Sequence, residues 1–539
     1  MLSVMNKIVF FIIPLFMYCL LRFLADLPVT GREADESYQA FAILNGGDFW
    51  NFRQTASSFA ITYLRIPFIA VFGLNDFGVR LPSILFGGIS LALLTLWIKS
   101  VKKHFPYSQK AHLWYLLILL VIFGFVFSPG VIQSNLFNLA DTVALLLTLL
   151  GLILFHKSPR LGIIFLLLAP FVSLFSMPLS IFILIYYGKI SNVGYKIYYL
   201  IPFLLISCIV SLLLNPGYFK SIAERSLVAE LKPSSYTWQI DRRLAYDQVE
   251  GSPLDTPEFN FNRIIHNKFT YGLNKFFYIV AGSIDLDKIS SPFQKPVSQN
   301  NFNINDQKLP DVFFFEIPLI FIGLLKLLQE KSRLIFIGVA GLLPIILFDG
   351  FKSFIYFSPF ILICIAVGLI TLAETLLHKF RIMGLIILLV LYLTAEISFQ
   401  DLLRFHPEEW MAESDFRQFQ IWNSAKDSGK KYSEIHVTDR LGDPKPYFLY
   451  YNKLTPFPAD QELKKYIFSS FKYLESDRKP NQLWVGLAGE FVGKFNQYKG
   501  VEQISDGKIL AKFPGVKQSD QFLGDELWIV ETVFDHDKK

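Results

Sequence analysis

Residues 354–375 read FIYFSPFILICIAVGLITLAET and hold one charged side chain in 22 positions. A helix that crosses the hydrocarbon core of a bilayer needs roughly 20 predominantly apolar residues, and this run supplies them. Comparable apolar runs recur near 8–25, 80–98, 112–128, 136–155, 197–214, 312–328, 334–349 and 382–398. We therefore predict a mainly α fold, a polytopic bundle of transmembrane helices.

The chain divides into two parts of different composition. Of its 539 residues, 53% are hydrophobic and 16% aromatic, more apolar surface than a water-soluble domain can hide. The last 139 positions hold 42 charged residues, and the first 400 hold 54. This contrast predicts a membrane domain over 1–398 and a soluble domain over 399–539. The net charge of +6 does not indicate nucleic acid, because the basic excess lies in short loops between apolar runs.

Clusters of lysine and arginine orient the chain, because basic loops stay on the cytoplasmic side of a membrane. The apolar run at 161–187 is interrupted by Met177-Pro178. If this run forms two short spans, every basic cluster falls on the same side, so we predict about 11 spans with a cytoplasmic N-terminus. The first span is expected to be a retained anchor. The loops at 26–79 and 215–311 and the C-terminal domain are then extracytoplasmic.

Periodicity predicts further elements within these outer segments. The stretch at 58–72 is expected to form a helix on the membrane surface or against the bundle, and 271–280 is an aromatic-rich helix candidate. The tail is predicted to be a small α/β domain that lacks a Gly-rich phosphate loop and serves as a lid or docking surface. Its expected helices are 409–428 and 460–475, and its expected strands are 433–438, 446–451, 482–487 and 527–532.

Acidic side chains near the outer face are the first candidates for chemistry. Asp35 and Glu36 follow the first predicted span, where paired carboxylates suit a general base, although ordinary solvated acids are also common in loops. Asp141 lies a few residues into an apolar span, and an acid there is costly unless it is paired or faces water. It is either a substrate-binding acid or a helix N-terminal acid that favours the dipole.

Cations and a tyrosine on the same face are the second group. Arg80 opens the second span and is expected either to bind phosphate or to extend to the interface. Lys352 and Tyr356 begin the tenth span, and Lys352 runs against the positive-inside trend. His266 and Lys268 lie in a polar loop and are weaker candidates. The three cysteines, Cys19, Cys208 and Cys364, lie in apolar runs and indicate neither a disulfide nor a metal site.

Acids and cations gathered on one membrane face fit transfer of a sugar from a lipid phosphate, with a carboxylate as base and cations holding the departing phosphate. Four segments make the chain similar to the protein-mannosyltransferase-like and aminoarabinose-transferase-like family of GT-C fold. They are DESY at 35–38, FGLNDFGVRLPSILFG at 72–87, Ala140-Asp141, and Tyr356 followed by Pro359. The 72–87 match is the most specific, because it is long and nearly unbroken.

The resemblance implies an inverting glycosyltransferase that uses a polyprenyl-phosphate sugar, with Asp35 as base and Glu36 supporting it. It implies no obligatory metal or other cofactor, and it implies a bacterial plasma membrane. Many members carry a Lys-Pro-Pro element where this chain reads Ser57-Ser58-Phe59-Ala60, so Arg53, Arg65 or Lys352 would contact the donor phosphate instead. The acceptor stays open between a glycan, a lipid and a protein.

Two other classes of function remain as alternatives. Transporters tend to show internal repeats and broken helices with polar groups at mid-membrane. A transporter is disfavoured, because neither feature is clear in the sequence and the acids cluster at one face. A catalytically inactive scaffold or receptor is favoured by the missing Pro-Pro element and opposed by Asp35, Glu36 and Asp141.

Overall fold

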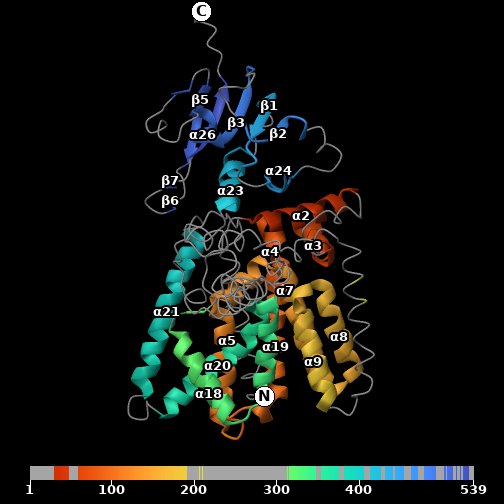
Figure 1. Cartoon of the computed structure of the whole chain (residues 1–539), viewed down its shortest axis with the longest axis vertical. Helices are drawn as coiled ribbons and strands as arrows, with labels where there is room; N and C mark the ends of the chain where they lie inside the picture. Colours follow the sequence, from red (N-terminus) through yellow and green to blue (C-terminus); the bar gives the residue numbers. More distant parts are fainter. Residues whose placement is uncertain are drawn as a thin grey trace, which may run out of the picture.

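The computed structural model is mainly helical, with a mixed sheet in its C-terminal part (Figure 1). It describes residues 29–47, 59–190, 206, 209, 312–313, 315–347, 354–375, 381–405 and 413–425. In the C-terminal part it describes 431–440, 443–453, 463–471, 479–492, 503–504, 507–513, 517–518, 522–523 and 526–532. The predicted span at 8–25, the predicted span at 197–214 apart from 206 and 209, and the whole loop at 215–311 with its helix candidate at 271–280 lie outside these residues.

The helices of the bundle follow the apolar runs of the sequence. They are α4 (Asp76–Ser100), α5 (Ala111–Phe127), α6 (Pro129–Phe137), α7 (Leu139–Lys157), α8 (Pro159–Val172), α9 (Met177–Ile190), α18 (Glu316–Gln329), α19 (Leu334–Leu347), α20 (Phe354–Thr375) and α21 (Arg381–Phe405). Among the described residues, α4 and α20 are each long and apolar enough to cross a membrane, and α5 and α6, bent by 54°, form a third candidate. The chain is a membrane protein, and the full count of about 11 spans stays a prediction.

The interruption predicted within 161–187 is confirmed. Helix α8 ends at Val172, a single 3-10 turn (η3) covers Leu174–Ser176, and α9 begins at Met177. A helix that was not predicted, α6, lies between α5 and α7, mostly over residues that fall between the predicted spans at 112–128 and 136–155. Pro129 stands at its first position, where a missing N–H costs nothing, so the proline starts a new helix there.

Glycines bring α18 and α20 into close contact. A Cβ atom added to Gly323 would lie 1.9 Å from the backbone oxygen of Cys364, and one added to Gly368 would lie 2.1 Å from that of Leu319. Small residues at such positions let two helix backbones approach, which favours association where lipid gives no hydrophobic drive. Cys364 is buried in this contact as a free thiol.

Two helices lie across the head of the bundle, beneath the C-terminal domain (Figure 1). Helix α3 (Phe59–Phe72) matches the helix predicted at 58–72. Helix α2 (Gly31–Leu44) carries Asp35 and Glu36 within a stretch interpreted from the sequence as a loop. Thr30 and Glu33 form a capping box at its start, a signature that the sequence displays.

The C-terminal domain holds a six-stranded sheet of order β2-β1-β3-β8-β5-β4. Strand β1 (Glu434–Val437) pairs in parallel with β2 (Tyr466–Phe468) and β3 (Gln482–Leu487), and β8 (Leu527–Thr532) pairs antiparallel with β3. The sheet ends with β5 (Gly507–Phe513) and β4 (Gln503–Ile504). Further elements are the helices α23 (Glu413–Ala425), α24 (Lys445–Asn452) and α26 (Ala488–Val492) and the strands β6 (Lys517–Gln518) and β7 (Phe522–Leu523).

Two predictions for this domain were wrong. The predicted strand at 446–451 is helix α24, because Pro444 and Pro446 fit a helix start and its four buried residues are consecutive rather than alternating. The predicted helix at 460–475 contains strand β2, whose Tyr-Ile-Phe sequence pairs with β1. The strands predicted at 482–487 and 527–532 are confirmed with the same bounds, and the strand at 433–438 and the helix at 409–428 are confirmed with shorter ones.

Candidate active site at the head of the bundle

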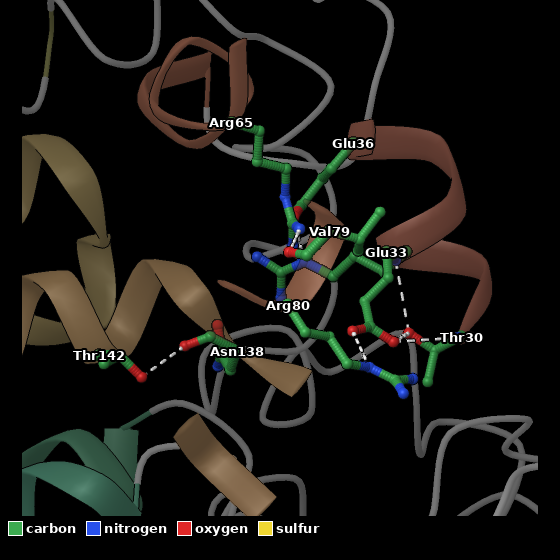
Figure 2. A network of polar contacts seen from close by, with 9 residues as sticks. Thr30, Glu33, Glu36, Arg65, Val79, Arg80, Asn138 and Thr142 are labelled. Atoms are coloured by element: carbon green, nitrogen blue, oxygen red, sulfur yellow. Dashed lines mark hydrogen bonds and ion pairs between the residues drawn. The ribbon is translucent and has the colours of Figure 1, made fainter. Parts of the chain in front are cut away.

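Two buried ion pairs tie α2 to α3 and α4, and a third pair lies within α2. Arg65 of α3 donates from Nη2 to Oε2 of Glu36 at 3.0 Å and from Nη1 to the carbonyl of Val79 at 2.5 Å (Figure 2). Arg32 donates from Nε to Oε1 of Glu36 at 2.9 Å. Arg80 of α4 lies 3.5 Å from Glu33, atom Nε to Oε1. Both carboxylates of α2 that face the bundle are therefore compensated by arginine.

The same network completes the capping of α2. The carboxylate of Glu33 accepts from the backbone N–H of Thr30 at 3.0 Å, and the Thr30 hydroxyl accepts from the backbone N–H of Glu33 (Figure 2). Glu33 thus caps its own helix and faces Arg80 from a position that is only 1% exposed. Sequence reasoning did not single out Glu33, although the T-x-x-E spacing from Thr30 marks it.

Asp35 and Glu36 are neighbours in sequence with opposite electrostatic environments. Burial alone would raise the pKa of Glu36, but the charges and hydrogen bonds of Arg32 and Arg65 outweigh it and lower that pKa. Burial raises the pKa of Asp35 to about 6, with the charges of Glu36 and Asp443 acting in the same direction and a hydrogen bond with Gln39 opposing them. One carboxylate is locked as an anion, and the other can exchange a proton near neutral pH.

Asp141 and Tyr356, predicted separately from the sequence, are in contact. The Tyr356 hydroxyl of α20 donates to Oδ1 of Asp141 at 2.9 Å, and the Ser173 hydroxyl donates to the same oxygen at 2.5 Å. Asn138 donates to Oδ2. Asp141 stands in the first turn of α7 and is fully buried, so it joins α7 to α20 and to the α8–η3 junction.

This junction gives a direct prediction for stability. Asp141→Ala removes the acceptor of two buried donors and one part-buried donor, and a buried donor costs about 1–3 kcal/mol when left unsatisfied. We expect the Asp141→Ala protein in detergent to unfold at a clearly lower temperature than wild type, and Tyr356→Phe to lie between the two. Equal unfolding temperatures for wild type and Asp141→Ala would show that the junction does not hold the helices together.

Arg32 was not singled out from the sequence, and the structure places it in the ion-pair network of α2. It pairs with Glu36 one turn along α2, and its charge also acts on Asp141 of α7. Its side chain is 36% exposed, whereas those of Arg65 and Arg80 are 1% and 5% exposed. The i, i+4 spacing of Arg32 and Glu36 was the signal available in the sequence.

The remaining predicted site residues divide into two groups. Arg65 and Arg80 lie at the site with their guanidinium groups engaged by Glu36 and Glu33. Lys352, His266 and Lys268 lie outside the described residues, as does Arg53. Within the ranges that the structure describes, no group of three or more His, Cys, Asp or Glu side chains could hold a metal ion.

No protein-family model and no curated protein matches the chain. Among solved structures it is similar to two of ArnT from Cupriavidus metallidurans. The structure in the apo state is 11% identical with a TM-score of 0.38, and the alignment covers 98% of each chain. The structure bound to undecaprenyl phosphate is 11% identical with a TM-score of 0.41, and the alignment covers 97% of each chain.

Proposed function

We propose that the chain is a membrane-embedded glycosyltransferase that moves a sugar from a polyprenyl-phosphate donor to an acceptor hydroxyl on the extracytoplasmic face. The observation that carries the proposal is the difference in pKa between two neighbouring carboxylates of α2. Glu36 is held ionised by two arginines, while Asp35 has a pKa of about 6. A general base works best with a pKa near the working pH, and perturbed carboxylates of this kind gather at functional sites.

In this proposal Asp35 takes the proton of the acceptor hydroxyl while the hydroxyl oxygen attacks the anomeric carbon. The bond from that carbon to the phosphate oxygen breaks on the opposite face, and the lipid phosphate leaves with the electron pair. The sugar inverts through an oxocarbenium-like state. Atoms and charges balance without a metal, because the proton goes to Asp35 and the negative charge to the phosphate.

The cations around α2 supply the electrostatic part of the reaction. Arg32 is the arginine of the network with substantial exposure, so we assign it the donor phosphate. Arg80 and Arg65 hold Glu33 and Glu36 and keep α2 in place. Lys352, His266 and Lys268 remain proposed phosphate or substrate contacts, and Asp141 with Tyr356 is proposed to support the substrate-binding region from below.

We further propose that the protein lies in a bacterial plasma membrane, with its N-terminus in the cytoplasm and 399–539 outside. The basic clusters of the sequence support this orientation. The acceptor would then be a glycan, a lipid or a protein that carries a free hydroxyl on the outer face.

The proposed function is tested by sugar release and transfer with purified protein in lipid, offered polyprenyl-phosphate sugars between pH 4.5 and pH 8. Asp35 can accept a proton only in its ionised form. The rate of transfer is therefore expected to rise with pH and to level off above a midpoint of about 6. No turnover with any donor would favour the scaffold. A rate independent of pH across this range would exclude Asp35 as the base.

A further inference from the structure

The C-terminal domain and the head of the bundle share one hydrophobic core. Helix α24 packs against α2, and its buried side chains Tyr447, Phe448 and Leu449 join the same cluster as Tyr38 of α2. Ile69 of α3 and Val79 of α4 belong to it as well, and so do the strand residues Val437, Val485 and Leu527. If the C-terminal domain were a freely opening lid, its hydrophobic core would be complete without residues of α2, α3 and α4. The shared core argues against such a lid.

A hydrogen bond joins the same domain to the start of α4. The Tyr450 hydroxyl donates to Oδ1 of Asp76 at 2.6 Å across 374 positions of sequence. Burial and the charge of Asp76 raise the pKa of Tyr450 above its usual range, so it stays a donor. Bonds of this type, from a neutral hydroxyl to a carboxylate, are short and strong.

From Asp76 the connection to α2 runs along one turn of helix α4 and then through an ion pair. Arg80 lies one turn after Asp76 on α4 and faces Glu33 at 3.5 Å, and Glu33 caps α2. The charges of Asp76, Arg80 and Glu33 all act on Tyr451, the neighbour of Tyr450, so these groups lie together under α24. Asp443, which accepts from the Lys445 N–H at the start of α24, also acts on Asp35.

We infer that Tyr450 is a positioning residue of the active site: through Asp76 and the Arg80–Glu33 pair, the C-terminal domain fixes the placement of α2 and its Asp35. The kinetic part of this inference rests on the proposed function, and the structural part does not. It assigns the C-terminal domain a role in turnover, which neither its sheet nor its lack of a phosphate loop suggested.

The test compares Tyr450→Phe, Asp76→Asn and the double variant with wild type. Losing a hydrogen bond to a charged acceptor is expected to lower kcat roughly 10-fold, with KM for the donor changed less than about two-fold. The double variant should match either single variant, because both remove the same bond. The control is Tyr432→Phe, whose hydroxyl accepts from Lys431 in the same domain and does not reach α4; its kcat should stay at the wild-type value.

Hydrogen exchange of the α2 amides provides a readout that needs no turnover. Tyr450→Phe is expected to speed exchange across 31–44 at least several-fold, and Tyr432→Phe is expected to leave it unchanged. Faster exchange in a protein without transferase activity would sustain the positioning role and overturn the proposed function. Wild-type exchange and wild-type kcat in Tyr450→Phe, or independent losses that add in the double variant, would overturn the inference.

Discussion

Asp35→Asn is expected to reduce sugar transfer by roughly 100- to 10,000-fold, the usual contribution of a general base, and at the same time to raise thermal stability at pH 7. The two effects have one cause. Asp35 is kept in surroundings that disfavour its charge, chiefly through burial and secondarily through Glu36 and Asp443. Asparagine has nearly the same shape as aspartate and carries no charge. The substitution therefore removes the cost of burying a charged side chain and also removes the base.

The sign of the pH dependence makes this prediction specific. The pKa of Asp35 rises from 3.8 to about 6 on folding, so the folded protein holds the proton more tightly than the unfolded chain. Its contribution to stability is then fully present below about pH 4 and is lost as the pH rises through about 6. The unfolding temperature of wild type should fall relative to Asp35→Asn over this window, as followed by tryptophan fluorescence in detergent.

An exposed carboxylate of the C-terminal domain serves as the matched control. Asp439→Asn removes the same charge from a surface position and should change neither turnover nor the pH dependence of stability. If Asp35→Asn keeps its activity, Asp35 is not the base, and Asp141 becomes the acid to test. If Asp35→Asn is inactive and also less stable than wild type, its role is structural.

Arg65→Met is expected to lower the free energy of unfolding by about 3–5 kcal/mol, because it leaves a buried carboxylate with half of its compensation. Arg65 is 1% exposed and donates both to Glu36 and to the carbonyl of Val79, so it joins α3 to α2 and α4 at once. Methionine fills a similar volume without a charge. Chemical denaturation in detergent measures the difference.

A double variant separates the charge from the packing. In Arg65→Met with Glu36→Gln the buried anion is gone too, so part of the lost stability should return. The comparison pair is Lys431 and Glu531, where the lysine side chain is 61% exposed, and Lys431→Met should leave the free energy of unfolding close to that of wild type. Equal losses in the free energy of unfolding for Arg65→Met and Lys431→Met would contradict the description of Arg65–Glu36 as a stabilising buried ion pair.

Local patterns of sequence predicted the elements whose environment is uniform. Sequence analysis found helices α4 and α20 and the strands at 482–487 and 527–532. Each of them is a continuous, mainly apolar run. Helix α24 escaped because its aromatic residues at 447–451 have high strand propensity, and packing on α2 decided otherwise. Helix α2 was missed because its acids suggested a solvated loop.

Many residues of the candidate site could be named from the sequence, although Arg32 and Glu33 were not, and the contacts between them could not be predicted. Asp35, Glu36, Arg65, Arg80, Asp141 and Tyr356 were all named from the sequence. That Tyr356 bonds to Asp141 across 215 positions, or that Arg65 and Arg80 each face a different glutamate of α2, depends on tertiary packing that no local pattern records. The same holds for Arg32, which shares Glu36 with Arg65 of another helix.

The shared core of α2 and the C-terminal domain has a consequence for biogenesis. A ribosome makes α2 early, yet the side chains that complete its packing surface come from 421–529, after the whole bundle has been synthesised. Until those residues have been synthesised, Tyr38 and its neighbours in the cluster lack part of their packing partners. A nascent chain stalled before that point would present an uncovered apolar surface to proteases and chaperones, so maturation of this site waits for the end of translation.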